Sequence, residues 1–335
     1  MEVIETGSVR VDLLGGTLDI YPINIVLPSV KTLNMATGLE AKIKISPNDK
    51  THIKIVSLDY QKQIIFSFSE LERIDSDTRK FGDFEFVARL LRFFSPTIGL
   101  DIELSSGAPP GSGLGGSSAM GAVLFKGCCR FFNREYPNDQ IVSIVQNIES
   151  KILNAGPAGY QDYYPSLYGG ILALKSRVDG VVVEQLYNNS IAQFLQREVR
   201  LIYSGVTRKS GINNWEVYKG FFDYAPGVRE GLGEISTLTN DAYDCLSDRK
   251  YDEFISLVKK EGLIREKLFP TILTENMKAF KHELEIENPN VGLKVCGAGG
   301  GGCFILTGLG DENISELLQK YGMSELPLDI SPPKK

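Results

Sequence analysis

Hydrophobic and polar positions alternate through much of the first 70 residues, a pattern typical of strands that bury one face. The clearest runs are "EAKIKIS" (40–46), "HIKIVSL" (52–58) and "QIIFSF" (63–68). A helical spacing follows in "FEFVARLLRFF" (84–94), and "GLDIELSS" (99–106) predicts another strand. We therefore expect the first third of the chain to form a mainly antiparallel sheet accompanied by a helix.

The apolar positions then take on a helical period. An amphipathic helix is predicted by the spacing of Met120, Val123, Leu124, Gly127, Cys128 and Phe131. A second helix is predicted from about Asn138 to Leu153, and two short strands near 169–176 and 180–187. Beyond them come a strand at 199–205, several helices up to about Glu287, and two strands around the glycines of 291–308. The order of predicted strands and helices changes near residue 190, which predicts two domains, 1–190 and 191–335.

Composition narrows the classes of protein to consider. The 335 residues are 42% hydrophobic and 23% charged, as in ordinary globular proteins, and only the tail "SPPKK" (331–335) is expected to be disordered. A net charge of -6 without a long basic run argues against nucleic acid as the main partner. No apolar run reaches the roughly 20 residues that span a bilayer, so no membrane partner and a cytoplasmic location are expected.

Cysteine and histidine usage limits the chemistry. The five cysteines show no CxxC spacing, and an odd number suits free thiols better than a disulfide framework. The two histidines, His52 and His282, lie far apart and in no motif. Zinc binding and base catalysis by histidine are therefore disfavoured.

A glycine-rich stretch, "PPGSGLGGSSAMG" (109–121), connects a predicted strand to a predicted helix. Its "GSGLGG" matches the GxGxxG dinucleotide pattern, with Glu135 or Asp139 as the acidic partner, but no βαβ series surrounds it. A Walker A loop is excluded, because Ser117 stands where that loop needs lysine. Two interpretations remain besides the dinucleotide site: a turn needed only for packing, and a phosphate cradle built from backbone amides and a helix start.

Two other segments accompany this loop and carry a family resemblance. "PPGSGLGGSSA" resembles the second motif of the GHMP kinases, the superfamily of galactokinase, homoserine kinase, mevalonate kinase and phosphomevalonate kinase. "LKVCGAGGGGCFILTG" (293–308) resembles their third motif, and "RVDLLGGTLDIYP" (10–22) their first motif in its sugar-kinase form. The three stand in family order, so the resemblance covers nearly the whole chain.

Within the superfamily, the chain looks most like the sugar and sugar-phosphate kinases such as D-glycero-D-manno-heptose 7-phosphate kinase and fucokinase. The matching positions are Arg10, Gly15, Gly16 and Asp19 in the first motif, Gly159, Gln161, Asp162 and Tyr164 in a G-x-Q-D-x-Y segment, and "SGVTRKS" (204–210). The chain departs from galactokinase, which has Glu-His where Gly16 and Thr17 stand.

The resemblance implies an α+β, two-domain GHMP kinase fold. The N-terminal, nucleotide-binding domain would be like ribosomal protein S5 domain 2, and the C-terminal domain would be a ferredoxin-like α/β domain. It also implies ATP and Mg²⁺ as cofactors. The nucleotide would bind Pro110, Gly111, Ser112, Gly113, Leu114, Gly115, Gly116, Ser117 and Ser118.

The resemblance also assigns roles to individual side chains. Asp162 would be the catalytic base and Arg10 would neutralise charge beside it. Mg²⁺ would be held by Glu149 with Ser118, or with Ser117 instead. The acceptor would be bound by Asp19, Gly16, Thr17, Tyr164, Gly299 and Gly300, and Thr207, Arg208 and Ser210 could contact substrate or phosphate.

Each assignment has a structural alternative. Asp162 could cap a helix or a turn, Arg10 could form a surface ion pair, and Glu149 could be solvated on its helix. The glycines of the third motif could form a packing turn. Tyr160, Tyr163 and Tyr164 could belong to the core and not to the acceptor pocket.

We therefore expect a kinase that transfers the γ-phosphoryl group of ATP to a hydroxyl of a small-molecule sugar or sugar phosphate. Heptose 7-phosphate or a related hexose, phosphorylated at the anomeric position, is the leading acceptor. The alternatives are a mevalonate-type kinase and a non-catalytic nucleotide or sugar sensor, and a homodimer is left open. The sequence does not identify the sugar or the hydroxyl.

Overall fold

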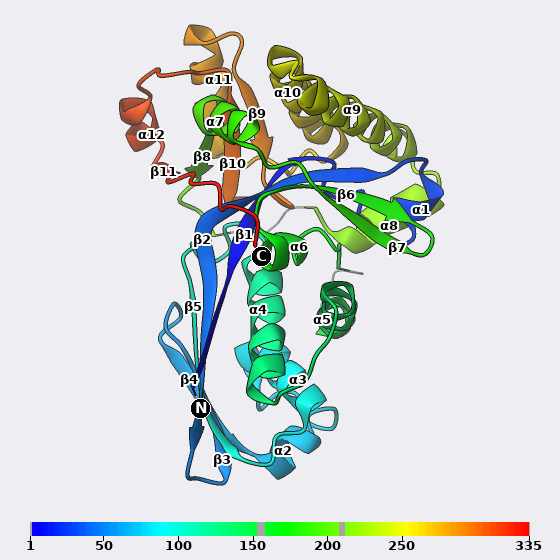
Figure 1. The fold of residues 1–335 in the computed structure, drawn as a ribbon. Helices are drawn as coiled ribbons and strands as arrows, with labels where there is room; N and C mark the ends of the chain where they lie inside the picture. Colours follow the sequence, from blue (N-terminus) through cyan, green and yellow to red (C-terminus); the bar gives the residue numbers. More distant parts are fainter. Residues whose placement is uncertain (1, 153–157, 208–211, 335) are drawn as a thin grey trace.

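The computed structural model describes residues 2–152, 158–207 and 212–334, which form two β-sheets with helices packed on them (Figure 1). The first sheet has the strand order β4-β3-β5-β2-β6-β7, with β1 paired to β2. Its strands are β1 (Val3–Leu14), β2 (Lys31–Asn48), β3 (His52–Ser57), β4 (Lys62–Ser67), β5 (Gly99–Ser106), β6 (Ile171–Arg177) and β7 (Gly180–Gln185). The runs that alternate in the sequence all lie in these strands, and the α+β class is confirmed.

Strand β2 organises the first sheet because it is long enough to pair with three others. Its C-terminal part pairs antiparallel with β5, its N-terminal part pairs with β6, and β1 runs antiparallel along nearly its whole length. Residues 10–22 comprise the last five residues of β1 and the turn that follows it.

Helices cover one face of this sheet. Helix α4 (Gly116–Phe131) packs on β1 and β2, and its neighbours α3, α5 and α6 pack against it (Figure 1). The helices of this part are α1 (Ile23–Val26), α2 (Phe68–Glu72), the 3₁₀ helix η1 (Gly82–Phe84), α3 (Glu85–Phe94), α5 (Asn138–Ile152) and α6 (Tyr164–Tyr168). The periodic segments at 84–94 and 138–152 are helical as predicted, and Leu153 lies outside the described residues.

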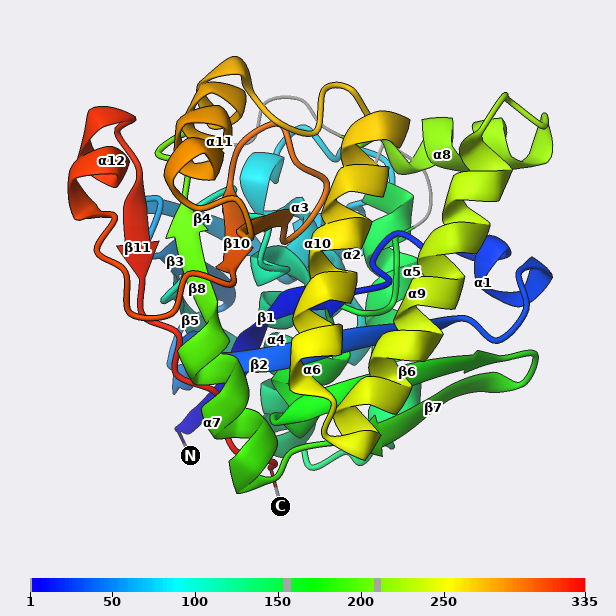
Figure 2. The ribbon, with the colours of Figure 1, turned by 90° about the horizontal axis from the view of Figure 1, so that it is seen from above.

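The second sheet is antiparallel, with the order β11-β8-β10-β9. Its strands are β8 (Val199–Tyr203), β9 (Gly292–Val295), β10 (Cys303–Thr307) and β11 (Ser324–Leu326). The helices of this part are α7 (Asn189–Glu198), α8 (Asn214–Phe222), α9 (Val228–Asp248), α10 (Tyr251–Leu268), α11 (Glu275–Glu287) and α12 (Ser315–Lys320). Helices α9 and α10 lie side by side, with α10 against β9 and α9 reaching β1 and β2 (Figure 2).

Residues 331–334 are ordered, contrary to the expectation for "SPPKK", whose last residue lies outside the described part of the chain. Ser331 donates a backbone hydrogen bond to Ala36 and accepts one from Gly170, and the half-buried Lys334 ammonium donates to the carbonyls of Thr6 and Ser166. Composition alone missed these backbone partners, which lie more than 150 positions away. Among the described residues, none of the helices combines the length and the apolar character that crossing a membrane requires.

Candidate active site

The three motifs meet around one cavity of about 770 Å³. It is lined by the turn after β1, the glycine loop before α4, Glu149 of α5, the segment 158–162, the loop after β9, and Arg265 of α10. Both sheets thus contribute to its wall. The apolar side chains of Phe84, Val87 and Met120 also line it.

The glycine loop presents a helix start to the cavity. Helix α4 begins at Gly116 after Gly115, whose φ of +71° no side chain adopts easily, and no side chain caps its first amides. Unpaired amides at a helix start carry partial positive charge and bind phosphate. The cradle interpretation of this loop therefore fits the structure. Gly116, Ser117 and Ser118 line the cavity, together with Pro110, Gly111, Ser112, Gly113 and Gly115.

Leu114 does not line the cavity, although the sequence predicted that it would bind the nucleotide. Its side chain is fully buried in the core, and its carbonyl accepts the backbone N–H of Arg10 at 3.0 Å. Leu114 therefore anchors the loop to β1, because an apolar side chain gains more free energy in the core than beside a phosphate.

The third motif packs backbone to backbone on this loop. A Cβ atom on Gly297 would lie 2.7 Å from the carbonyl oxygen of Gly113, and the N–H of Cys303 donates to the carbonyl of Ser112 at 2.6 Å. Gly299 and Gly300 are a correction: both pack on Ile272, to whose carbonyl Gly300 donates at 2.9 Å, and neither lines the cavity. Close packing, not acceptor binding, requires glycine at these two positions.

Arg10 joins the three motifs to Asp162. Its Nε donates to Asp162 Oδ1 at 2.9 Å, and its Nη2 lies 2.7 Å from the same oxygen. Its Nη1 donates at 2.7 Å to the carbonyls of Gly113 and Cys296. Arg10 is only 3% exposed, so the alternative of a surface ion pair does not hold. Burial alone would lower the pKa of Arg10, but the charges of Asp162 and Asp12 outweigh it and raise that pKa.

Glu149 is buried, not solvated, and lies beside Ser118. Its Oε2 accepts the hydroxyl of Ser118 at 2.8 Å and the hydroxyl of Tyr163 at 2.6 Å. Burial raises the pKa of Glu149, and the bonds from Tyr163 and Ser118 oppose that rise. Ser117 is exposed at the cavity. Sequence reasoning missed the contact of Tyr163, because a tyrosine in a loop gives no sign of a partner 14 positions away.

Residues of the first motif line the same cavity as Asp162. Asp19 is 2% exposed and its Oδ2 accepts the N–H of Gln161 at 2.9 Å. Burial raises the pKa of Asp19 from its ordinary 3.8 to about 7. Gly16 and Thr17 also line the cavity. The buried Oε1 of Gln161 has no hydrogen-bond partner, so a hydroxyl donor in the cavity would satisfy it.

Tyr164 does not reach the cavity, contrary to the prediction. It is 3% exposed, its ring packs against those of Tyr160 and Tyr168, and it does not line the cavity. Its position at the start of α6 turns the side chain into the core. Arg208, Lys209 and Ser210 lie outside the described residues.

Five further charged residues that the sequence did not single out line the cavity: Asp12, Asp59, Lys62, Asp83 and Arg265. Asp12 lies within the apolar run of β1, where a charged residue is a signal that could have been noticed. Arg265 forms an i, i+4 pair with Glu261, which in sequence looks like any solvated helix pair.

The side chains present suit magnesium and a nucleotide. Mg²⁺ is usually held by one or two protein oxygen ligands together with substrate phosphates, and Glu149 with Ser118 offers such a pair beside the uncapped start of α4. Within 2–152, 158–207 and 212–334 there is no cluster of three or more His, Cys, Asp or Glu residues that could hold a metal. The residues thus fit a site that the nucleotide would complete.

Comparison with known proteins identifies one domain of the chain. The sequence model of the GHMP kinases N terminal domain matches residues 84–170, which contain the glycine loop and Asp162. The chain contains a GHMP kinase N-terminal domain over these residues. GHMP kinases are ATP-dependent small-molecule kinases, so the dinucleotide interpretation of the glycine loop is set aside.

Its relatives are GHMP kinases with different acceptors. The chain is 25% identical to the mevalonate kinase of Methanocaldococcus jannaschii, over 97% of each chain. It is 24% identical to the bifunctional fucokinase/GDP-fucose pyrophosphorylase of Arabidopsis thaliana, over 93% of this chain but only 30% of that protein. The fold resembles that of a D-glycero-D-manno-heptose 1-phosphate kinase from Bacteroides thetaiotaomicron, at 20% identity and a TM-score of 0.73, over 99% of this chain and 97% of that one. It also resembles Lactococcus lactis galactokinase, at 15% identity and a TM-score of 0.74, over 100% and 95%.

Proposed function

We propose that this GHMP kinase transfers the γ-phosphoryl group of ATP, with Mg²⁺, to a hydroxyl of a sugar or sugar phosphate. The observation that carries the proposal is the position of Asp162. Its carboxylate is held by Arg10, lines the cavity, and lies against Gly115 at the start of the phosphate cradle. That is where an acceptor hydroxyl must give up its proton.

The residues divide the work of phosphoryl transfer. Backbone amides at the start of α4 bind the triphosphate, and Glu149 with Ser118 holds the cation. Mg²⁺ held by these two residues would supply positive charge that offsets the charge of the phosphates. Asp162 accepts the hydroxyl proton, while Arg10 fixes the orientation of the carboxylate. The reaction needs positioning and charge stabilisation more than covalent chemistry.

The acceptor end of the cavity, defined by Asp12, Gly16, Thr17, Asp19, Gln161, Asp162 and Arg265, favours a polyol over a carboxylic acid. It contains three carboxyl groups, and Arg265 and the nearby Arg10, which also lines the cavity, each already contact a carboxylate. A mevalonate carboxylate would be repelled here, whereas sugar hydroxyls would donate to Asp19 and Gln161. The acceptor we propose first is a hexose, or a heptose 7-phosphate whose own phosphate lies outside this end, phosphorylated at the anomeric position.

Mevalonate is the second candidate, and similarity to a mevalonate kinase over 97% of the chain is the observation that favours it. A coupled ADP-release assay over free sugars, sugar phosphates and mevalonate separates the two. Turnover with a sugar or sugar phosphate and none with mevalonate is expected. Turnover with mevalonate alone would overturn the sugar assignment, and tight ATP binding without turnover on any acceptor would indicate a sensor.

A further inference from the structure

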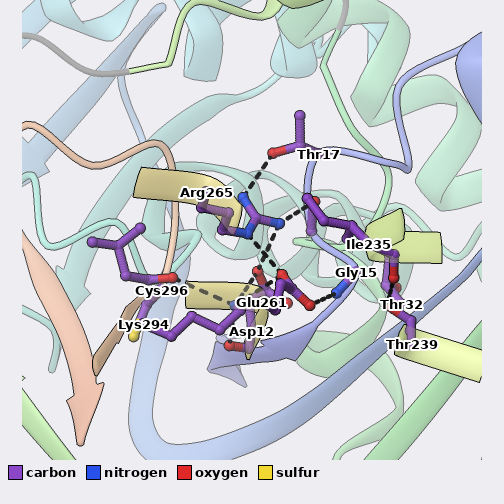
Figure 3. A network of polar contacts seen from close by, with 12 residues as sticks. Asp12, Gly15, Thr17, Thr32, Ile235, Thr239, Glu261, Arg265, Lys294 and Cys296 are labelled. Atoms are coloured by element: carbon purple, nitrogen blue, oxygen red, sulfur yellow. Dashed lines mark hydrogen bonds and ion pairs between the residues drawn. The ribbon is translucent and has the colours of Figure 1, made fainter. Parts of the chain in front are cut away.

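Four charged side chains are buried together beneath the turn Gly15–Thr17. Asp12 lies near the end of β1, Lys294 belongs to β9, and Glu261 and Arg265 belong to α10; each is at most 1% exposed (Figure 3). Lys294 Nζ lies 2.8 Å from Asp12 Oδ2 and 3.7 Å from Glu261 Oε1. Arg265 Nε lies 2.7 Å from Glu261 Oε1, and its Nη2 lies 3.9 Å from Asp12 Oδ2. We call these four residues the buried charge cluster.

Stability alone does not explain the cluster. Removing four charges from water is costly, and well-packed apolar residues in the place of such pairs often stabilise a protein more. Burial by itself would raise the pKa of Asp12, but Lys294, Arg265 and Arg10 outweigh it and lower that pKa. Two cations thus balance two anions in the cluster. A buried charge cluster without net charge can hold a neighbouring segment in one conformation.

The segment that it holds is the turn itself. Arg265 Nη2 donates to the carbonyl of Gly16, and its Nη1 donates to Thr17 Oγ1 at 3.1 Å. Glu261 Oε2 accepts the N–H of Gly15 at 2.9 Å. All three residues of the turn are therefore bound by α10, which lies about 250 positions further along the chain.

The turn needs such support because its backbone is strained. Thr17 has a φ of +75°, a left-handed conformation that is a genuine outlier for a β-branched residue. Gly16 has no room for a side chain, since a Cβ atom there would overlap the carboxylate of Asp12 and lie 2.9 Å from Gln161 Nε2. The strain places Thr17 on the wall of the cavity, next to Asp19.

We propose that Arg265 is a positioning residue that holds Thr17 in this conformation and so sets the affinity of the kinase for its acceptor. The inference rests on the proposed function only in assigning this end of the cavity to the acceptor. Arg265 acts through the turn: its planar fork reaches two turn atoms and Glu261 at once, a geometry that lysine cannot reproduce.

The first experiment compares Arg265→Lys with Arg200→Lys. Arg200 also forms a two-pronged pair with a carboxylate, that of Glu325, but it lies on the second sheet away from the cavity. Arg265→Lys should raise the KM for the acceptor about tenfold or more and leave the KM for ATP within about twofold, because only the turn is released. Arg200→Lys should change neither. Equal changes in both KM values, or no change in the acceptor KM, would overturn the proposal.

Amide hydrogen exchange provides a test that needs no turnover. The N–H groups of Gly15 and Thr17 should exchange faster in Arg265→Lys than in the parent chain, whereas amides of α4 should not change. Unchanged exchange in the turn would refute the positioning role even in a chain with no detectable kinase activity. Failure of the proposed function would look different. The parent chain would then turn over no acceptor, while the turn amides would still exchange faster in Arg265→Lys than in the parent.

A second pair of variants keeps the test valid if Arg265→Lys does not fold. Thr17→Val removes the hydroxyl that Arg265 contacts and retains the β-branched strain, while Thr17→Ser keeps the hydroxyl. Neither disturbs a buried charge. Faster exchange of the turn amides in Thr17→Val, but not in Thr17→Ser, is expected. Equal exchange in the two variants would show that Arg265 does not hold Thr17 through its hydroxyl, and the proposal that it positions Thr17 would fail.

Discussion

Arg10 and Asp162 lie 152 positions apart in the chain, yet the guanidinium contacts one carboxylate oxygen at 2.9 Å through Nε and at 2.7 Å through Nη2. The arginine is buried, while the Asp162 side chain is 26% exposed at the cavity. Arg10 thus binds one oxygen of the Asp162 carboxylate, and the exposed part of that carboxylate faces the cavity in which an acceptor would bind.

Replacing Asp162 with asparagine should separate chemistry from binding. Asn keeps the shape and can still accept from Arg10, but it cannot take up a proton, so kcat should fall about 100-fold or more. ATP affinity, measured by isothermal titration calorimetry, should stay within about twofold. Asp179→Asn, at an exposed position between β6 and β7, is the matched control and should behave like the parent. A variant at position 162 with the parental kcat would show that Asp162 is not the base.

Substituting Ser117 and Ser118 separately should show which of them holds Mg²⁺ together with Glu149. Ser118→Ala removes a hydroxyl bonded to Glu149, whereas Ser117→Ala removes an exposed one. We expect Ser118→Ala to raise the Mg²⁺ concentration for half-maximal turnover about tenfold, and Ser117→Ala to raise it less. A titration of activity with Mg²⁺ at saturating ATP measures both. The reverse order would make Ser117 the ligand.

The raised pKa of Asp19 predicts a pH-dependent stability. Because this pKa is about 7 in the folded chain and 3.8 ordinarily, the folded state holds the proton more tightly. The resulting stabilisation is fully present below about pH 4 and is lost as the pH rises through about 7. The free energy of unfolding should therefore decline between these limits in the parent relative to Asp19→Asn, as measured with urea. Parallel pH profiles for parent and variant would contradict the assignment.

Substitutions at two glycines test the packing of Asp162 against the start of α4. In Gly115→Ala, the new Cβ atom would lie 3.0 Å from the Cβ and Cγ atoms of Asp162 at a φ of +71°. Activity should fall and stability should drop by about 1 kcal/mol or more. Gly233→Ala, within α9 and with open space around it, should instead stabilise the chain by about 0.5–1 kcal/mol. Denaturant unfolding measures the stability of each variant, and kcat measures its activity. Unchanged activity in Gly115→Ala would contradict the inference that a side chain at position 115 displaces Asp162.

Local patterns predicted the elements well, because their causes are local. The alternation at 52–58 and the helical spacing at 84–94 reflect which side of an element faces the core, and both elements form as predicted. The glycine loop could likewise be placed between a strand and a helix. Its neighbours in space could be identified only by resemblance, because no periodic pattern reports which segments meet.

The errors and omissions at the site share one physical origin. Tyr164, Gly299 and Gly300 match the family motifs, but the packing of α6 and of the loop near Ile272 turns them away from the cavity. Asp12 and Arg265 went unnoticed because their partners lie far along the chain. A motif gives the order of residues along the chain, whereas the direction of a side chain depends on tertiary packing.

The contact between Gly113 and Gly297 has a consequence for how such an enzyme can be divided. A sequence boundary near residue 190 separates two regions of different texture, but the cleft has one wall on each side of that boundary, and the walls touch through bare backbone. Grafting residues 1–190 onto an unrelated second half would transfer every residue of the phosphate loop without transferring the cleft. Modularity in the sequence is therefore not modularity in the active site, and the two halves must be exchanged together.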